Sequence, residues 1–295
     1  MERRNAEKPK IVCVVGPTAS GKTGFAIDLA KQRNGEIVSC DSMQIYKYMD
    51  IGTAKPTKEE QAEVPHHMID FADPNEDFSV ADFVERARLC IDDIIARGKL
   101  PVLCGGTGLY VDSVVNQVEY PEGTRDDKYR AMLWEIAEKE GNEAIHNMLR
   151  QVDEIAAESI HPNNTKRVIR ALEICKTSGM TKTEADRLAI KTPIYDAEMI
   201  GLNMDRARLY DRINRRVDIM IEQGLLDEVK TLLDMGIRRN STAMQAIGYK
   251  ELLLYIDGKC SFDEAIEKIK QESRRYAKRQ LTWFGRNKNI LWVEK

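Results

Sequence analysis

The sequence lacks any long hydrophobic stretch, and no run of eighteen apolar residues occurs among its 295 residues. A membrane-spanning helix is therefore not expected, because about 20 apolar residues are needed to cross a bilayer. The first ten residues are largely polar, and the apolar run Ile11–Val15 that follows is too short for a secretory signal. We expect a cytoplasmic protein with no membrane partner.

Cysteine spacing of the zinc-binding kind is also missing. The six cysteines include no C-x-x-C pair and no cluster with histidine, so reduced, structural thiols are expected. The adjacent pair His66–His67 is a poor metal site, because neighbouring residues of an extended chain point to opposite sides. We expect one packed and one hydrogen-bonded histidine. No internal repeat, low-complexity tract or oligomerisation signature is found, which favours a monomer.

Charge of one sign is not in large excess, since the net charge is only −3. Basic residues are nevertheless concentrated in places. Arg206–Arg216 holds five arginines and one aspartate, and Arg274–Lys288 holds six basic residues and no acidic one. These stretches favour a confined positive surface for a polyanion or, alternatively, solvated helix faces. In RRYAKRQLTWF (Arg274–Phe284), the interleaved aromatics fit either contact with a nucleic-acid backbone or a helix docked on a sheet.

Strand and helix patterns alternate in the first part of the chain. Short β-rich runs at Ile11–Val15, Glu36–Ser39 and Leu100–Cys104 are typical of buried parallel strands. Between them, Ser79 and Asp82 form an approximate capping box at the start of a helical pattern. This order predicts an α/β fold, with a parallel sheet flanked by helices as in the phosphate-loop (P-loop) nucleotide hydrolases.

The pattern changes after the third strand. Residues 120–127 are turn-rich, and the charged stretch that follows has helical spacing and no convincing strand. Strand patterns return at Ile200–Met204 and Ile290–Val293. We therefore predict a catalytic core interrupted by an all-helical insertion, with the core formed by residues 1–118 and 200–295 and the insertion by residues 119–199.

The segment GPTASGKT lies between the first strand and a helical pattern. It fits G-x-x-x-x-G-K-T, the nucleotide-binding loop of ATP-using hydrolases and kinases. Backbone N–H groups and a helix N-terminus would bind phosphate oxygens, Lys22 would add a positive charge, and the Thr23 hydroxyl suits Mg²⁺. The candidate phosphate-binding residues are Gly16, Pro17, Thr18, Ala19, Ser20, Gly21, Lys22 and Thr23.

The acid that phosphoanhydride hydrolases place after a second strand to hold Mg²⁺ is missing. The third strand runs into Gly105 and Gly106 instead, and His67–Asp70 (HMID) is a weak substitute, which weakens the case for ATP. Asp41 directly follows the second strand. Because the carboxyl ends of parallel strands share one edge, we expect its carboxylate to face the loop, where it could accept a proton or help hold Mg²⁺.

Two of these assignments have structural alternatives. Asp41 could serve only as a helix N-cap, which is a common role for aspartate after a strand. Thr107 in GGTG supplies a hydroxyl at the same edge, but turn formation alone would explain the glycines around it.

Six motifs occur in the order and spacing of one family. GPTASGKT, DSMQIYKYMDIGTAKP, GGTGLY, KRVIRALEI, QAIGYKE and RRYAKRQLTWF resemble the bacterial tRNA dimethylallyltransferases, also called tRNA isopentenyltransferases. The resemblance spans residues 11–284, and the long second motif is its most specific part. It implies that the loop holds the diphosphate of dimethylallyl diphosphate rather than ATP.

The resemblance also implies a reaction. The enzyme would move a dimethylallyl group to N6 of the adenine that is 3′-adjacent to the anticodon (position 37), in tRNAs reading codons that begin with U. Diphosphate leaves, and Mg²⁺ is the implied cofactor. Asp41 matches the family's catalytic aspartate, and Thr107 would contact the reacting nucleotide. The adenine would have to flip out of the anticodon loop to react.

The resemblance places the insertion at the anticodon stem–loop, where recognition through splayed bases and backbone contacts is expected. Gln245 falls where relatives carry either arginine or glutamine, and it receives no role. The implied tRNA contacts are Asp41, Ser42, Met43, Gln44, Thr107, Arg130, Lys166, Arg167, Val168, Ile169 and Arg170.

Two other classes of function compete with this one. A small-metabolite kinase with the same loop would use the insertion as a lid and would bind ATP tightly. A non-catalytic RNA-binding module switched by a nucleotide would bind tRNA in an ATP- or ADP-dependent way without modifying a base.

Overall fold

The chain folds into two compact units, which are described separately. A computed structural model describes residues 7–119, 126–188 and 190–295. Unit 1 comprises Met1–Val115 and Ile194–Lys295, and unit 2 comprises Asn116–Pro193. Most of the turn-rich segment predicted at residues 120–127 lies outside the described residues. No helix in the described part of the chain is long and apolar enough to cross a membrane.

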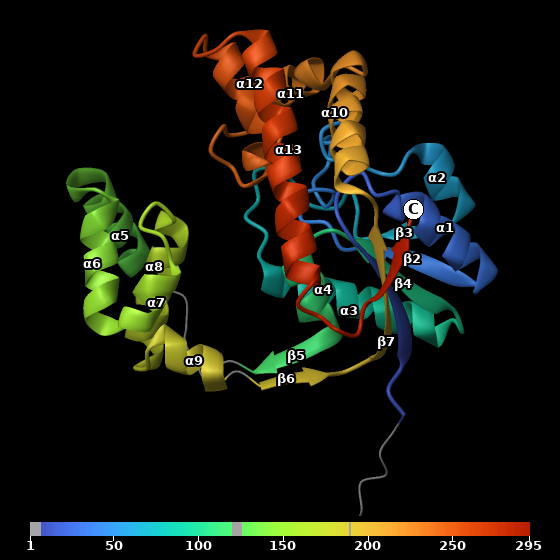
Figure 1. Cartoon of the computed structure of the whole chain (residues 1–295), viewed down its shortest axis with the longest axis horizontal. Helices are drawn as coiled ribbons and strands as arrows, with labels where there is room; N and C mark the ends of the chain where they lie inside the picture. Colours follow the sequence, from blue (N-terminus) through green and yellow to red (C-terminus); the bar gives the residue numbers. More distant parts are fainter. Residues whose placement is uncertain (1–6, 120–125, 189) are drawn as a thin grey trace, which may run out of the picture. The chain divides into compact units, whose positions relative to one another are not determined.

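Unit 1 is built on a six-stranded sheet in which every described pair of strands is parallel (Figure 1). The strand order is β3-β2-β4-β1-β7-β8. The neighbours of the central strands β4 and β1 are not consecutive in the sequence, so crossover connections join them. This confirms the predicted α/β class with a parallel sheet flanked by helices. The strands are β1 (Lys10–Val15), β2 (Gly35–Ser39), β3 (His66–His67), β4 (Leu100–Gly105), β7 (Asp196–Asn203) and β8 (Leu291–Glu294).

Helices cover both faces of this sheet. Side chains of a strand alternate between its faces, so one strand contributes to the cores on both sides. Along β1, Ile11, Cys13 and Val15 join the larger core, whereas Val12 and Val14 join a smaller core beneath α1. The helices of unit 1 are α1 (Lys22–Gln32), α2 (Lys58–Glu63), α3 (Val80–Ala96), α4 (Gly108–Val115), α10 (Arg206–Glu222), α11 (Leu225–Asp234), α12 (Tyr249–Ile256) and α13 (Phe262–Phe284), with a 3₁₀ turn at Ala243–Gln245.

The helix predicted to begin at Ser79 is α3. The Ser79 hydroxyl accepts the Asp82 N–H, and the Asp82 carboxylate accepts the Ser79 N–H, which completes the capping box. Two backbone donors that a helix leaves unpaired are thereby satisfied. Gly98, with φ of 70°, follows the end of the helix.

The described part of unit 2 holds five helices around a small core of residues such as Leu133, Ile145 and Leu149. The first and last elements of the unit, β5 and β6, pair as a two-stranded antiparallel ribbon. The elements are β5 (Asn116–Glu119), α5 (Asp127–Glu140), α6 (Asn142–Val152), α7 (Glu154–Ser159), α8 (Thr165–Ser178), α9 (Lys182–Leu188) and β6 (Ile190–Pro193).

The boundaries of unit 2 differ from those drawn on the sequence. The insertion was drawn at residues 119–199 without a strand, whereas the unit ends at Pro193 and carries the ribbon. Residues 196–199 belong to β7, which begins earlier than the predicted Ile200. The charged residues Asp196 and Glu198 interrupt the apolar pattern, so the sequence alone did not indicate that β7 begins there. The Glu198 carboxylate pairs with Arg33 at the surface.

Glu36, on β2, is the centre of a charge cluster at the sheet. Its carboxylate is almost fully buried and accepts hydrogen bonds from Arg97, Lys99 and His67. The Arg97 hydrogen bonds are the main reason that the pKa of Glu36 lies well below its usual range. His66 is hydrogen-bonded as well, through Nδ1 to Val64 O at 2.7 Å, so both histidines have hydrogen-bond partners.

Glu36→Gln is expected to lower the free energy of unfolding at pH 7 by about 3 kcal/mol, because it removes a buried carboxylate from three donors. The pKa is lower in the folded chain, so the contribution is complete above the unfolded pKa of about 4.3 and is lost as pH falls below it. Urea denaturation of both proteins between pH 7 and pH 3 measures the difference. A difference that stays constant down to pH 3 would contradict this assignment.

Candidate functional site

The glycine-rich loop joins β1 to α1 at the carboxyl edge of the sheet. Gly16, Ala19 and Gly21 have positive φ angles of 142°, 62° and 88°. Gly16 has no room for a side chain, since a Cβ would lie 2.6 Å from Leu202 O. The loop therefore turns back on itself above the N-terminus of α1, a geometry in which backbone N–H groups converge on an anion.

Hydrogen bonds from α13 and from within the loop itself fix its shape. The Thr18 N–H donates to Gln280 Oε1 at 2.8 Å, and the Lys22 ammonium donates to Pro17 O at 2.6 Å. The Ser20 hydroxyl is buried and has no hydrogen-bond partner in the described part of the chain. A buried hydroxyl without a partner is costly, and a ligand oxygen in the loop would satisfy it.

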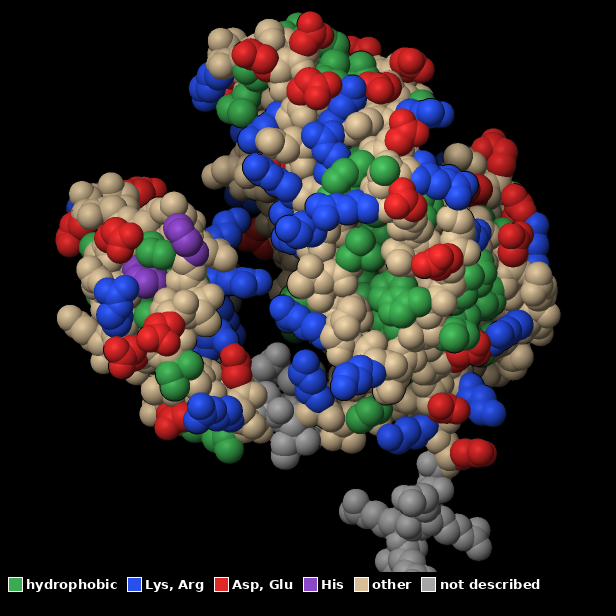
Figure 2. Space-filling view, in the orientation of Figure 1, with side chains coloured by type: hydrophobic (Ala, Val, Ile, Leu, Met, Phe, Trp, Pro, Cys, Tyr) green, Lys and Arg blue, Asp and Glu red, His purple; other side chains and the backbone are tan. Residues whose placement is uncertain are grey.

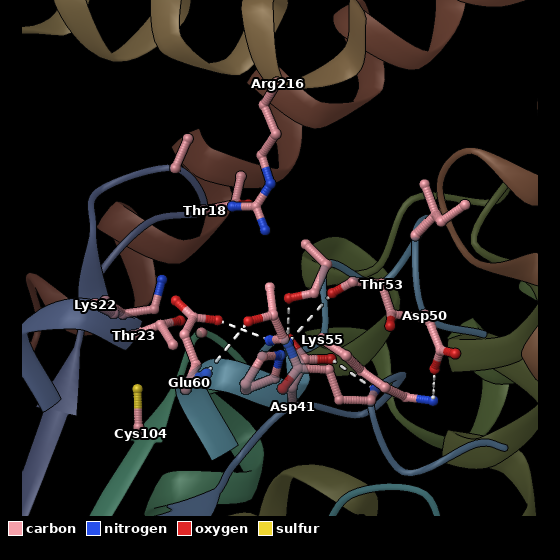
Figure 3. Close-up of a pocket in the computed structure, with 18 of the residues that line it drawn as sticks. Thr18, Lys22, Thr23, Asp41, Asp50, Thr53, Lys55, Glu60, Cys104 and Arg216 are labelled. Carbon is pink, nitrogen blue, oxygen red and sulfur yellow. Dashed lines mark hydrogen bonds and ion pairs between the residues drawn. The ribbon is translucent and has the colours of Figure 1, made fainter. Parts of the chain in front are cut away.

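The loop borders a cleft of about 670 Å³ within unit 1. Lys22 from the loop, Asp41 and Arg216 line this cleft (Figure 3). Burial lowers the pKa of Lys22 to about 8, and burial also lowers the pKa of Arg216. The Asp41 charge opposes both shifts. Two partly desolvated cations therefore face the cleft, and an anion placed there would favour their charged forms.

Asp41 follows β2 and holds the turn after it. Its Oδ1 accepts the Met43 N–H at 2.8 Å and lies 3.4 Å from the Gln44 N–H. The residues after Asp41 form a turn rather than a helix, so the helix N-cap alternative does not apply. Asp41 nevertheless lines the cleft. The turn uses only part of the acceptor capacity of its carboxylate, so further hydrogen bonds can form.

Thr107 connects the end of β4 to the end of β2. Its Oγ1 accepts the Ser42 N–H at 3.2 Å, and its own N–H lies 3.4 Å from Cys40 O. Its hydroxyl also lies near Tyr276 of α13 and lowers the pKa of that phenol, against the larger effect of burial. Burial, together with the Asp41 charge, raises the pKa of Tyr276 to about 12, so this phenol stays protonated.

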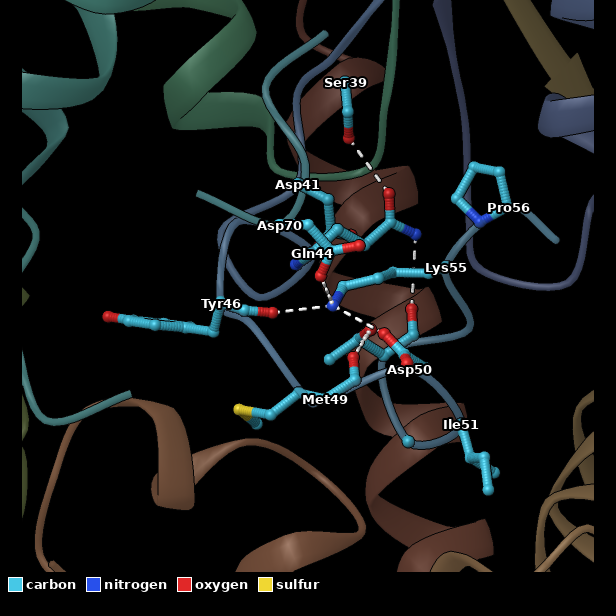
Figure 4. Close-up of polar contacts among 12 residues, drawn as sticks. Ser39, Asp41, Gln44, Tyr46, Met49, Asp50, Ile51, Lys55, Pro56 and Asp70 are labelled. Atoms are coloured by element: carbon cyan, nitrogen blue, oxygen red, sulfur yellow. Dashed lines mark hydrogen bonds and ion pairs between the residues drawn. The ribbon is translucent and has the colours of Figure 1, made fainter. Parts of the chain in front are cut away.

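Gln44 lines the larger cavity, but the polar atoms of its side chain form hydrogen bonds within the protein. Its Oε1 accepts the Ser39 hydroxyl at 2.9 Å, and its Nε2 donates to the carbonyls of Thr53 and Ala54 at 3.2 and 3.0 Å (Figure 4). Ser42 and Met43 instead line a second cavity of about 310 Å³.

The two cavities share part of their walls. Asp41 lies among the shared residues, so it is part of the wall of both cavities. The residues that line both cavities are Thr18, Asp41, Thr53, Ala54, Arg216, Met220 and Tyr276.

A magnesium ion at this site would depend on few protein ligands. Thr23, the candidate metal ligand in the sequence, lines the larger cavity. No group of three or more His, Cys, Asp or Glu side chains suited to a metal is found among the described residues. The donor set therefore fits Mg²⁺ held by the Thr23 hydroxyl, phosphate oxygens and water, which is a common arrangement for this ion.

The residues from Lys166 to Arg170, which the resemblance assigns to tRNA contact, lie on α8 of unit 2. Lys166, Arg167 and Arg170 are exposed, whereas Val168 and Ile169 are buried in the core of the unit. A helix turns 100° per residue, so a continuous stretch cannot present every side chain to a partner. Val168 and Ile169 therefore offer no side-chain surface to tRNA in this fold.

Arg130 and Arg170 converge on one carboxylate in unit 2. Arg130 Nε lies 3.2 Å from Glu173, and Arg170 donates to the other oxygen of the same group. Glu173 is fully buried and also accepts the Asp126 N–H at 3.0 Å. Both guanidinium groups remain partly exposed, and Figure 2 shows Lys and Arg side chains along one edge of this unit.

Several site residues were not identified from the sequence. Arg216 and Arg212 come from the arginine-rich Arg206–Arg216, which was noted only for its charge; Arg212 Nε donates to Ala19 O at 2.8 Å. Gln280 and Tyr276 come from RRYAKRQLTWF. Their helix α13 docks on the site, so this motif acts at least partly inside the protein.

The fold and the site define an open parallel α/β protein whose candidate ligand site lies at the carboxyl ends of the strands. Family models described as "IPP transferase" and "Isopentenyl transferase" match residues 44–288 and 9–70. The chain belongs to the IPP transferase family.

Individual relatives agree with this membership. The tRNA dimethylallyltransferase of Halalkalibacterium halodurans is 54% identical over 288 residues, which cover 97% of this chain and 91% of the relative. That of Bacillus velezensis is 52% identical, covering 99% and 92%. The crystal structure of the full-length tRNA isopentenylpyrophosphate transferase from Bacillus halodurans shares 52% identity with a TM-score of 0.73, covering 97% and 90%.

A more distant solved structure, of a eukaryotic dimethylallyltransferase acting on tRNA, is 30% identical with a TM-score of 0.80 and covers 97% of this chain and 74% of that one. Family membership places the chain among prenyl-transferring enzymes. A metabolite kinase and a nucleotide-switched RNA-binding module, the two alternatives raised by the sequence, are not favoured.

Binding of inorganic diphosphate is expected to weaken about 10-fold between pH 7 and pH 9, because a Lys22 ammonium with a pKa of about 8 is then mostly deprotonated. Titration calorimetry measures the dissociation constant at each pH. Diphosphate also titrates, so Lys22→Arg serves as the control whose charge does not change in this range. An equal pH dependence in both proteins would contradict a role for the Lys22 proton.

Proposed function

We propose that the protein transfers a dimethylallyl group from dimethylallyl diphosphate to N6 of adenine 37 in tRNAs reading UNN codons, with release of diphosphate. The observation that carries this proposal is the position of Asp41, which shares a cleft with a glycine-rich loop while β4 ends in glycine rather than in a hydrolase acid. The names of the relatives support the same reaction.

Asp41 is the base in this mechanism. An adenine amine is a weak nucleophile, because its lone pair is delocalised into the ring. As N6 attacks C1 of the allyl group, the C1–O bond to diphosphate breaks and the N6 proton passes to the Asp41 carboxylate. General-base assistance of this kind contributes roughly 10²–10⁴ in rate.

The glycine-rich loop, from Gly16 to Thr23, binds the leaving diphosphate. Its backbone N–H groups, Lys22 and Arg216 stabilise the charge that diphosphate gains as the bond breaks. Mg²⁺ held at Thr23 would supply further positive charge there. Gly16, Pro17, Thr18, Ala19, Ser20 and Gly21 shape the binding surface, and the buried Ser20 hydroxyl supplies a hydrogen bond to a phosphate oxygen.

The reacting atoms meet where the two cavities adjoin. Diphosphate occupies the loop side of the larger cavity, and the flipped adenine approaches along Ser42, Met43 and Thr107. Gln44 contributes by positioning the loop beside Asp41 rather than by touching tRNA. Extrusion of the base costs a few kcal/mol, which contacts to the anticodon arm must offset.

Unit 2 contacts the anticodon arm through exposed cations. Lys166, Arg167, Arg170 and Arg130 are placed to bind phosphates, and Glu173 orients the two arginines that reach it. We also propose that the protein works as a monomer in the cytoplasm, where its tRNA substrate is found.

Asp41→Asn is expected to lower kcat by 10²–10⁴-fold, because the amide cannot accept the N6 proton but can still accept the Met43 N–H. Incorporation of labelled dimethylallyl diphosphate into a UNN-reading tRNA, with Mg²⁺, measures turnover, and mass spectrometry of the digested tRNA locates the product. The dissociation constant for tRNA should change by less than about threefold. Absence of label with the wild-type protein, in an assay where a relative works, would refute the proposed function.

Glu173→Gln separates orientation from charge in tRNA binding. The substitution makes unit 2 more positive by one charge, so simple electrostatics predicts tighter binding to a polyanion. If Glu173 instead orients Arg130 and Arg170, binding weakens, by an expected three- to tenfold. The tRNA dissociation constant at two salt concentrations decides between these outcomes, and tighter binding would refute the orienting role. An unchanged helical circular dichroism spectrum is the control for folding.

A further inference from the structure

The segment Asp50–Ala54, called here loop 50–54, forms part of the wall of both cavities. Asp50 and Ile51 line the larger cavity, Gly52 lines the smaller, and Thr53 and Ala54 line both. The position of this loop therefore sets the shape of the region where the two cavities adjoin. Two side chains that line neither cavity hold the loop from behind.

Glu228, on α11, accepts three successive backbone N–H groups of the loop. Its Oε2 lies 2.8 Å from both the Asp50 and Ile51 nitrogens, and its Oε1 lies 3.1 Å from the Gly52 nitrogen. Successive N–H groups that converge on a carboxylate form charge-assisted hydrogen bonds, which are about twice as strong as neutral ones. One side chain thus fixes three residues of the loop.

Tyr249, at the start of α12, completes this arrangement. Its hydroxyl donates to Glu228 Oε1 at 2.6 Å, and its ring is fully buried against Gly52. A Cβ at Gly52 would lie 2.4 Å from the Tyr249 ring. The pair accounts for two motifs together, since Gly52 belongs to DIGTAKP and Tyr249 to QAIGYKE.

Loop 50–54 needs such support because its backbone is strained, and it transmits its position to Asp41. Ala54 has a φ of 47°, a left-handed conformation that is unfavourable for residues other than glycine. The carbonyls of Thr53 and Ala54 receive the Gln44 amide, and the Gln44 N–H lies beside the Asp41 carboxylate. Movement of the loop would therefore shift Gln44 and, with it, the turn that holds Asp41 (Figure 4).

We propose that Glu228 and Tyr249 are positioning residues for the transfer reaction: they hold loop 50–54 so that Asp41 and the shared cavity wall keep the geometry that the reaction needs. This inference rests on the proposed function. Neither residue contacts the diphosphate loop Gly16–Thr23 or unit 2 through a described hydrogen bond. Their loss should therefore affect turnover and leave the binding of diphosphate and of tRNA largely intact.

Glu228→Gln is the sharpest variant, because it keeps the shape of the side chain. An amide nitrogen cannot accept a hydrogen bond, so at least one of the three backbone N–H groups loses its partner in either orientation of the amide. Tyr249→Phe removes a single hydrogen bond and keeps the ring against Gly52. Asp227→Asn, on the same helix, is the matched control, because that carboxylate is 82% exposed.

Hydrogen–deuterium exchange of the full-length protein tests the contact without reference to activity. In the wild type the amides of residues 50–52 should be protected. Glu228→Gln should speed their exchange at least 10-fold, Tyr249→Phe should have a smaller effect, and Asp227→Asn should have none. Unchanged exchange in Glu228→Gln would overturn the proposal.

Steady-state kinetics tests the consequence. Glu228→Gln should lower kcat about 10- to 100-fold, as expected for a small misplacement of reacting groups, with Tyr249→Phe intermediate. The dissociation constants for inorganic diphosphate and tRNA should stay within twofold of wild type. Faster exchange with unchanged kcat would reduce the pair to a structural role, and a loss confined to binding would also overturn the proposal. If the wild type shows no transfer, the proposed function fails, while the exchange experiment still tests the contact itself.

Discussion

The close approach of the Cys40 backbone to Gly105 is the constraint on which the site depends. A Cβ at Gly105 would lie 2.1 Å from Cys40 O, so only glycine allows the ends of β2 and β4 to meet there. This contact brings Thr107 to the Ser42 N–H, beside Asp41. The order β2-β4-β1 then places the glycine-rich loop next to the same edge. Gln280 links the glycine-rich loop to the end of β4, because it accepts the Thr18 N–H and donates to Gly106 O.

Those parts of the fold that depend on local signals could be predicted from the sequence. The strand–loop–helix around GPTASGKT, the strand before Asp41 and the capping box at Ser79 each carry their information within a few residues. Short or polar strands do not, which is why β3, with two residues, and the ribbon of β5 with β6 were missed. Their pairing is decided by partners distant in the sequence, and a four-residue strand has too little alternation to show it.

The site could be predicted only in part, for the same physical reason. Loop residues and Asp41 follow predicted strands, so topology alone brings them to one edge. Arg216 and Gln280 reach that edge from helices about 200 and 260 residues further along the chain, and nothing local marks their direction. The assignment of Val168 to tRNA stays a prediction, but its side chain is buried in the core of unit 2. A family motif that is continuous in sequence does not form a continuous surface on a helix, because helical periodicity directs Val168 to the core.

The arrangement of charge in the cleft is consistent with the proposed function, in which one site serves a diphosphate donor and an amine acceptor. Burial disfavours the charged forms of Lys22 and Arg216 in the free protein. A bound diphosphate reverses this, and the benefit grows as the C–O bond breaks and negative charge accumulates on the leaving group, so the same cations favour the transition state over the ground state. A carboxylate close to diphosphate would oppose this effect. In the proposed reaction, diphosphate binds on the loop side of the larger cavity, and the amine approaches from the second cavity, which Asp41 also lines. Lys22 lines only the larger cavity, whereas Asp41 and Arg216 both line the shared wall, so the proposed leaving group and nucleophile meet at that wall.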